Sequence, residues 1–268
     1  MSPKVTTPKL PLIIGHRGAS ALAPENTIAS FVRAFQDGAD GIEFDVRLAR
    51  DQVPVVIHDR TLRRTGRVAG AVSDFTAAEL ARVDAGSWFN RRYPDQAQSE
   101  YERETIPSLE QLFTTLAETD GLFYLEMKCE NGQPTPLATA VVKSIRQLAL
   151  VERVIVESFD LSVLAEVKRI DPAIRVAALF ESRIRRPLAG LKIKSSVDLA
   201  FELGAAEVAL HYDLVSDSLV GKASRLGLAT VVWTVDDPQW ISRAQRFGIK
   251  ALITNKPGKM VQARAKTH

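Results

Sequence analysis

Short apolar runs alternate along this chain with segments whose apolar residues recur at helical spacing. The runs predict nine strands, at residues 12–16, 41–47, 53–58, 121–128, 153–158, 174–180, 207–211, 229–235 and 251–254. Between the first two runs, Ile28, Phe31, Val32 and Phe35 follow the i, i+3, i+4, i+7 pattern of an amphipathic helix. This alternation is typical of βα units around a parallel sheet.

The nine predicted strands are one more than an eight-stranded barrel requires. Only residues 49–52 separate the second run from the third, whereas a parallel crossover needs roughly a dozen residues, so this link predicts an antiparallel hairpin. Without the returning arm, eight parallel strands remain, which indicates an α/β TIM (β/α)8 barrel. A turn centred on residues 50–52 would place His58 opposite residues 43–45.

Residues 59–107 form the longest stretch without a clear βα unit. Connections of this length inside a compact domain are usually functional. We interpret this stretch as a small insertion beside the barrel mouth, within a single domain that spans residues 1–268. At the other end, the basic residues 256–268 are predicted to fray.

Composition excludes several classes of protein. The net charge is only +3 in 268 residues, and the basic residues are scattered, so we expect no nucleic-acid partner. No apolar stretch approaches the ~18 residues of a membrane span. The single cysteine, Cys129, rules out an internal disulfide and fits a reducing compartment. Because residues 1–10 lack the apolar region of a secretory signal, we predict a cytoplasmic location. Homo-oligomerisation stays open.

Three carboxylates occupy strand positions where an unpaired charge would be costly. Glu43 and Asp45 lie two residues apart, so both project from one face of their strand. Glu126 would end the next strand of the barrel. Such a cluster repels itself unless a cation lies between its members, and oxygen-only ligands suit Mg²⁺ or Ca²⁺. The alternative is that each carboxylate pairs with a nearby arginine or lysine.

Two of the four histidines, His16 and His58, end apolar runs. They could be zinc ligands, hydrogen-bonded core residues, or acid and base groups. Zinc usually requires further histidine or cysteine ligands. The single cysteine, Cys129, would point to the opposite side of its strand from Lys128, which disfavours zinc. Their place beside a carboxylate cluster favours general acid and base roles, because the imidazole pKa lies near neutrality.

Three further side chains are expected at the same strand ends. Arg17 and Lys128 supply positive charge, and an arginine fork suits phosphate or carboxylate oxygens. They would bind a substrate phosphate, neutralise the carboxylates, or do both. Trp233 ends a late strand and is either core packing or the wall of the pocket.

The motifs resemble the glycerophosphodiester phosphodiesterase family over nearly the whole chain. The segments that carry the resemblance are Gly15-His16-Arg17-Gly18, Pro24-Glu25-Asn26-Thr27, Gly38 to Val46 and Val55 to Asp59. Leu125-Glu126-Met127-Lys128 extends it, and weaker matches include Ser158-Phe159, Trp233-Thr234-Val235 and Ile253 to Pro257. The chain departs from the family pattern at Gln52, where glycine is usual, and at Asn255, where aspartate is common. We expect neither departure to touch the chemistry.

The resemblance implies a TIM barrel that hydrolyses glycerophosphodiesters to sn-glycerol 3-phosphate and an alcohol, with a divalent cation, in glycerol and lipid metabolism. It implies that Glu43, Asp45 and Glu126 ligate the metal, that His16 and His58 are acid and base, and that Arg17 and Lys128 hold the phosphate. The nucleophile is either water or the substrate's own glycerol 2-hydroxyl.

Two rival functions remain at this point. An enzyme of the same fold could act on lysophospholipids, as a phosphodiesterase or in the manner of a phospholipase D, and the aromatic residues of the insertion leave room for this: Phe75, Trp88, Phe89 and Tyr93. A phosphodiester-binding protein without catalysis is the other rival, and the complete set of histidines and carboxylates argues against it.

Overall fold

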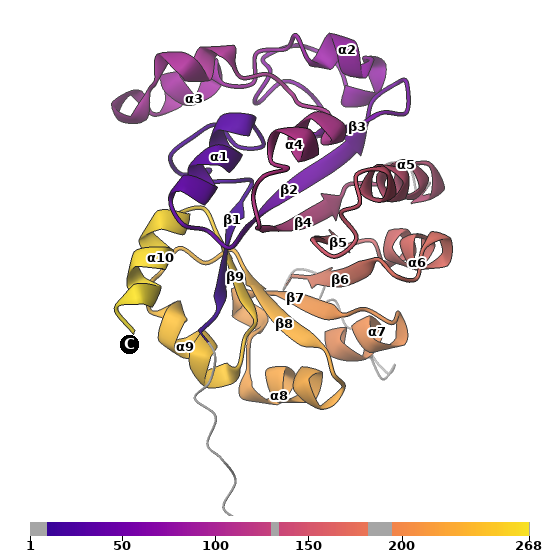
Figure 1. Cartoon of the computed structure of the whole chain (residues 1–268), viewed down its shortest axis with the longest axis vertical. Coiled ribbons are helices and arrows are strands. Elements are labelled where there is room, and N and C mark those ends of the chain that lie inside the picture. The colour runs from indigo at the N-terminus through magenta and orange to yellow at the C-terminus, as the bar shows by residue number, and fades with distance from the viewer. Residues whose placement is uncertain (1–9, 130–133, 182–194, 268) are drawn as a thin grey trace, which may run out of the picture.

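A computed structural model describes residues 10–129, 134–181 and 195–267. Within these ranges the strands form one nine-stranded sheet, and eight of them close into a parallel ring in the order β1, β2, β4, β5, β6, β7, β8, β9. Helices surround the ring, as Figure 1 shows. The predicted TIM barrel is confirmed, and so is the extra strand outside it.

The predicted strands agree closely with those observed. The strands are β1 Leu12–His16, β2 Gly41–Leu48, β3 Pro54–Val56, β4 Leu122–Met127, β5 Val154–Ser158, β6 Arg175–Phe180, β7 Glu207–His211, β8 Ala229–Trp233 and β9 Ala251–Thr254. The helices are α1 Ile28–Gln36, α2 Ala77–Leu80, α3 Ser87–Arg92, α4 Leu109–Thr115, α5 Pro134–Gln147, α6 Leu161–Ile170, α7 Ser196–Glu202, α8 Asp217–Arg225, α9 Trp240–Phe247 and α10 Pro257–Ala265.

The hairpin of β2 and β3 has the register that the short link predicts. The strands are antiparallel, with Val46 opposite Val56 and Leu48 opposite Pro54. Beyond the paired strands, the Ile57 amide donates to the Asp45 carbonyl at 2.9 Å. Because β3 runs back toward the barrel, His58 arrives beside the carboxylates of β2.

Apolar side chains alternate between the two faces of the barrel strands. On β2, Ile42, Phe44 and Val46 face outward and join the large core between the strands and the surrounding helices. A smaller cluster that includes Ile14 and Tyr124 fills the barrel interior. Filling the interior leaves the functional side chains only at the carboxyl ends of the strands, where TIM barrels place their active sites.

The insertion after β3 contains α2, α3 and short 3₁₀ turns, and it lies above the β2 and β3 end of the barrel in Figure 1. It has small apolar clusters of its own, one of them around Leu62 and Leu80. The prediction that residues 256–268 fray is wrong for most of that segment. There α10 buries Met260, and Arg264 pairs with Asp40, because its apolar residues pack on the barrel despite the basic composition. No helix of the described residues is both long and apolar enough to span a bilayer.

Candidate active site

A tight turn after β1 brings the first two site residues together. The backbone of Arg17 has φ +53° and that of Gly18 has φ +83°. A side chain at Gly18 would collide with Ser30, whose Oγ would lie 2.3 Å from the added Cβ. Glycine is therefore required there for the chain to turn against α1 and to keep His16 and Arg17 at the barrel mouth.

The three carboxylates meet as predicted. Oxygen atoms of Glu43, Asp45 and Glu126 all lie within 4.8 Å of one another. Parallel pairing explains this, because Asp45 of β2 stands opposite Glu126 of β4. The exposed fractions of these residues are only 2%, 0% and 7%.

Burial and mutual repulsion disturb the ionisation of this triad. Burial, followed by the charges of Asp45 and Glu126, raises the pKa of Glu43 well above its usual range. Burial and the charge of Asp45 raise the pKa of Glu126 to about 7. Burial also opposes ionisation of Asp45, but Lys128 and Arg17 outweigh it and hold the pKa of Asp45 low.

The two basic residues contact the same carboxylates. Lys128 Nζ lies 2.5 Å from Glu126 Oε1 and 3.1 Å from Asp45 Oδ1. The Arg17 backbone amide donates to Glu43 Oε2 at 3.0 Å, and its Nε lies 3.2 Å from Asp45 Oδ2. Two positive charges thus face three carboxyl groups, which leaves the cluster one positive charge short of neutrality when all three are ionised.

His58 is held in a chain of charged groups. Its Nδ1 lies 2.6 Å from Asp59 Oδ1, and Arg64 Nε donates to the other oxygen of Asp59 at 2.6 Å. Arg64 also contacts Glu25, which in turn pairs with Arg17 at 2.9 Å. Because Asp59 binds Nδ1, the Nε2 atom of His58 is left for the pocket.

His16 has a neutral partner instead. Its Nδ1 lies 2.7 Å from Asn255 Oδ1, and the amide group of Asn255 donates to Asp236 at 2.9 Å. These bonds leave the Nε2 atom of His16 facing Glu43, 3.8 Å from Oε2. Burial, then the charge of Arg17, lowers the pKa of His16 to about 4. The expectation that Asn255 stays clear of the chemistry is therefore wrong, because Asn255 orients a predicted acid or base.

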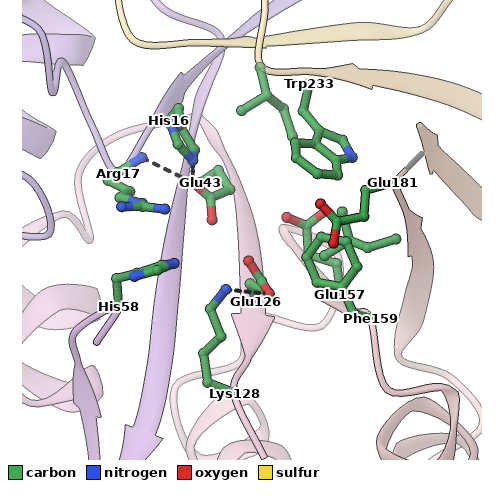
Figure 2. A pocket seen from close by; sticks show the side chains of 12 residues that line it. His16, Arg17, Glu43, His58, Glu126, Lys128, Glu157, Phe159, Glu181 and Trp233 are labelled. Atoms are coloured by element: carbon green, nitrogen blue, oxygen red, sulfur yellow. Dashed lines mark hydrogen bonds and ion pairs between the residues drawn. The ribbon is translucent and has the colours of Figure 1, made fainter. Parts of the chain in front are cut away.

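All the predicted residues except Asp45 line one cavity of about 230 Å³ at the barrel mouth. Figure 2 shows His16, Arg17, His58 and Lys128 on one side, with Trp233 opposite. Asp45 is fully buried and contacts two of the lining residues, Arg17 and Lys128. A second cavity of about 260 Å³ shares His16 and Arg17 and extends toward the insertion.

The sequence analysis missed four residues of this site. Asn26 holds Asp45 by a 2.8 Å bond from Nδ2, while Asp59 and Asn255 orient the histidines. Glu157 of β5 lines the cavity. Asn26, Asp59 and Asn255 lie within the sequence motifs that resemble the phosphodiesterase family, and those motifs are the signal that could have identified them. Glu157 lies in none of the motifs given above and has no such signal.

The triad fits a divalent cation. Its donors are all oxygen atoms, and they converge within a few ångströms. Burial and the neighbouring negative charges raise the pKa values of both glutamates. A cation between the carboxylates would offset the free-energy cost of ionising them. Oxygen-only donors suit Mg²⁺ and Ca²⁺ rather than zinc.

Comparison with known proteins gives the same identification. The sequence model of the glycerophosphoryl diester phosphodiesterase family matches residues 16–259. A glycerophosphodiester phosphodiesterase of Caldanaerobacter subterraneus is 32% identical over 250 residues, which cover 93% of this chain and 96% of that protein. An Oleispira antarctica phosphodiesterase, solved in complex with the product sn-glycerol-3-phosphate, has a TM-score of 0.82 and 28% identity, covering 95% of this chain and 96% of that one. A glycerophosphodiester phosphodiesterase structure from Agrobacterium tumefaciens has a TM-score of 0.77 and 26% identity, and the match covers 94% of this chain and 100% of that one. The chain therefore belongs to the glycerophosphoryl diester phosphodiesterase family.

Proposed function

We propose that this enzyme hydrolyses glycerophosphodiesters to sn-glycerol 3-phosphate and an alcohol, and that it requires a divalent cation. The observation that carries the proposal is the buried triad of Glu43, Asp45 and Glu126 between two histidines whose Nδ1 atoms are already engaged. The product complex of the Oleispira antarctica phosphodiesterase supports the same product here.

In this proposal the triad holds Mg²⁺ or Ca²⁺, which polarises the phosphoryl oxygens when bound. Arg17 and Lys128 lie on the same side of the cavity as the triad, and they hold the remaining phosphate oxygens. Their contacts with the carboxylates keep both side chains beside the reacting phosphate. A fully buried Asp45, tied to Asn26, fixes that arrangement.

The partners of the two histidines suggest different roles. Burial lowers the pKa of His58 overall, but the charge of Asp45 and the bond to Asp59 oppose that shift and support the imidazolium form. We therefore assign His58 as the general acid that protonates the leaving alkoxide. The Nδ1 of His16 has an amide partner instead of a carboxylate, and its pKa of about 4 makes the ring neutral at pH 7, so that Nε2 can accept a proton. We assign His16 as the general base.

The second cavity is the place we propose for the leaving alcohol. Trp88 and Tyr93 of the insertion line it together with Ala21, and the other lining residues are polar: His16, Arg17, Ser20, Glu25, Asp236 and Asn255. A mostly polar lining favours a small hydrophilic headgroup over the acyl chain of a lysophospholipid. It also explains how a segment outside the barrel could select the substrate.

A substrate panel tests the proposed function. Purified enzyme is incubated with sn-glycero-3-phosphocholine, sn-glycero-3-phosphoethanolamine and lysophosphatidylcholine, and the products are separated by chromatography. We expect sn-glycerol 3-phosphate and the free alcohol from the first two, with at least about ten-fold lower kcat/KM on the lysolipid. Faster release of choline from lysophosphatidylcholine would replace the proposal with the lysophospholipid alternative.

A further inference from the structure

Arg64 lies in the loop that follows β3, and its guanidinium group bonds two carboxylates at once. Its Nη1 and Nη2 atoms donate to the two oxygens of Glu25, at 2.7 and 2.8 Å. Its Nε and Nη2 atoms donate to the two oxygens of Asp59, at 2.6 and 3.0 Å. Ion pairs at the protein surface contribute little to stability, but a bidentate contact between arginine and a carboxylate fixes the geometry of both groups. Arg64 makes two such contacts, so it determines how both carboxylates are oriented.

The loop that carries Arg64 is anchored on both sides. In the insertion, Leu62 is fully buried in an apolar cluster, and the Gly66 amide donates to the Leu62 carbonyl at 2.9 Å. On the barrel side, Glu25 is itself held by Arg17 at 2.9 Å. The guanidinium group of Arg64 therefore has a fixed position between the insertion and the barrel.

Asp59 connects this arrangement to the reaction. Its Oδ1 atom lies 2.6 Å from Nδ1 of His58 and also accepts from Nη2 of Arg64. The side chain of His58 is 33% exposed, so packing alone does not hold the ring. Figure 2 shows that ring pointing into the pocket. Because both of its oxygens are bonded to Arg64, Asp59 keeps one orientation and holds His58 in the matching one.

We propose that Arg64 is a positioning residue for the reaction, which acts through Asp59 to keep Nε2 of His58 directed at the leaving-group oxygen. This inference rests on the proposed function and on the assignment of His58 as the general acid. As the bond from phosphorus to the alcohol oxygen breaks, the Nε2 proton moves to that oxygen, so the imidazole must already point at it. Arg64 lines neither of the two mouth cavities, and it therefore acts without touching the substrate.

Two other roles fit Arg64 less well. Binding the phosphate directly would require N–H groups that face a cavity, but four of its five N–H groups donate to the two carboxylates. Fastening the insertion to the barrel would not require a contact with the neighbour of a histidine. Arg50 already provides such a fastening, because it donates to the Asp74 carbonyl at 2.8 Å and pairs with Glu79 at 3.1 Å.

Two substrates with the same glycerol phosphate group isolate the proton transfer. In sn-glycero-3-phosphocholine the leaving group is an alkoxide that needs a proton, whereas in the p-nitrophenyl phosphodiester of sn-glycerol it needs almost none. We expect Arg64→Ala to reduce kcat/KM on glycerophosphocholine by about 10- to 100-fold, which is part of the cost of removing a general acid. On the p-nitrophenyl ester the loss should be at most about three-fold.

A double-mutant cycle identifies the residue through which Arg64 acts. Arg64→Ala is introduced into the wild-type enzyme and into His58→Ala, and kcat/KM on glycerophosphocholine is compared in the two backgrounds. In the second background no general acid remains to be positioned. The further loss there should therefore be at most about three-fold.

Two variants separate positioning from charge and from anchoring. Arg64→Lys keeps the charge but loses the planar fork, so it should still lose at least about three-fold on glycerophosphocholine. Arg50→Ala is the matched control, since it removes another arginine that ties the insertion to the barrel, and it should keep wild-type activity on both esters. Circular dichroism and thermal unfolding check the fold of each variant. If Arg64→Ala does not fold, Arg64→Lys takes its place in both comparisons.

Several outcomes would overturn the inference. Equal losses on the two esters, or the same loss in both backgrounds of the cycle, would mean that Arg64 does not act through His58. Full activity of Arg64→Lys would mean that charge alone suffices, and an equal loss in Arg50→Ala would mean that only anchoring of the insertion matters. A wild-type enzyme that forms no sn-glycerol 3-phosphate from either ester would instead overturn the proposed function.

Discussion

Replacing Glu126 with glutamine should stabilise the metal-free protein at alkaline pH, although it removes one member of the triad. Burial and the charge of Asp45 raise the pKa of Glu126 from 4.5 to about 7, despite the contact with Lys128. At ~1.4 kcal/mol per pH unit, this difference means that ionising Glu126 costs the folded state about 3 kcal/mol. Glutamine has nearly the same shape and carries no charge, so it avoids this cost.

The sign of the effect depends on pH. The folded state binds the Glu126 proton more tightly than the unfolded state does, so stability is highest below pH 4.5 and falls as the pH rises to about 7. The advantage of Glu126→Gln should therefore be absent near pH 4.5 and grow through this window. Above pH 7 it should level off at about 2–3 kcal/mol, because protonation of Glu43 relieves part of the repulsion.

Urea unfolding in EDTA, followed by circular dichroism at several pH values between 4.5 and 8, measures this difference. Glu118→Gln is the control, because Glu118 is exposed and precedes β4, at the opposite end of that strand from Glu126. At pH 8, a saturating divalent cation should make the wild-type protein more stable than Glu126→Gln, because only the wild-type protein gains the free energy of binding the cation. A Glu126→Gln variant that is less stable than wild type at pH 8 in EDTA would refute the reasoning, because the contact with Lys128 would then outweigh burial and repulsion.

Three further predictions concern activity. Glu43→Gln should lose the cation and at least about 10³-fold in kcat/KM while remaining folded, as metal analysis and circular dichroism will show; full activity after exhaustive chelation would remove the metal from the mechanism. His58→Ala should lose about 10²–10⁴-fold on glycerophosphocholine but far less on the p-nitrophenyl ester of glycerol, whose leaving group needs no proton, whereas His16→Ala should lose on both. If His16→Ala were the variant spared on the p-nitrophenyl ester, His16 would be the general acid and His58 the general base. Loss of the cation from either variant would show that the replaced histidine is a metal ligand. Trp88→Ala with Tyr93→Ala should change the ranking of headgroups more than kcat on the best substrate, and an unchanged ranking would leave the insertion with a structural role only.

Local pattern and chain length were enough to predict the barrel and the triad. The short link between residues 48 and 53 allowed only a hairpin, and the period of two along β2 placed Glu43 and Asp45 on one face. Parallel pairing then brought Glu126 opposite Asp45. These inferences hold because strand geometry is regular and the register of a hairpin follows from its turn.

The partners of the histidines could not be predicted in the same way. The contact between His16 and Asn255 joins residues 239 positions apart, and it depends on closure of the ring between β1 and β9. Glu157 lines the cavity because β5 pairs with β4 and places Glu157 opposite Glu126. Such features depend on side-chain packing at the barrel mouth, which no periodicity in the sequence encodes.

The prediction that residues 256–268 fray was wrong for a different reason. Its basic composition suggested fraying, yet α10 buries Met260 completely, and Arg264 pairs with Asp40. Arginine and lysine can cover apolar surface with their stems while their charged ends pair or face water. Composition alone therefore underestimates how well a basic helix can pack.

The formation of sn-glycerol 3-phosphate from glycerophosphocholine, with and without chelation, tests the central claim most directly. Product is measured through a coupled glycerol 3-phosphate dehydrogenase reaction, with the protein first treated with EDTA and then supplied with Mg²⁺ or Ca²⁺ in excess; the coupling enzyme is controlled by added product. We predict steady formation of product by the untreated enzyme, loss of at least about 10²-fold after chelation, and recovery on adding one of the two cations. Undiminished formation of product by an enzyme shown to be free of metal would contradict the assignment of the buried triad as a catalytic cation site.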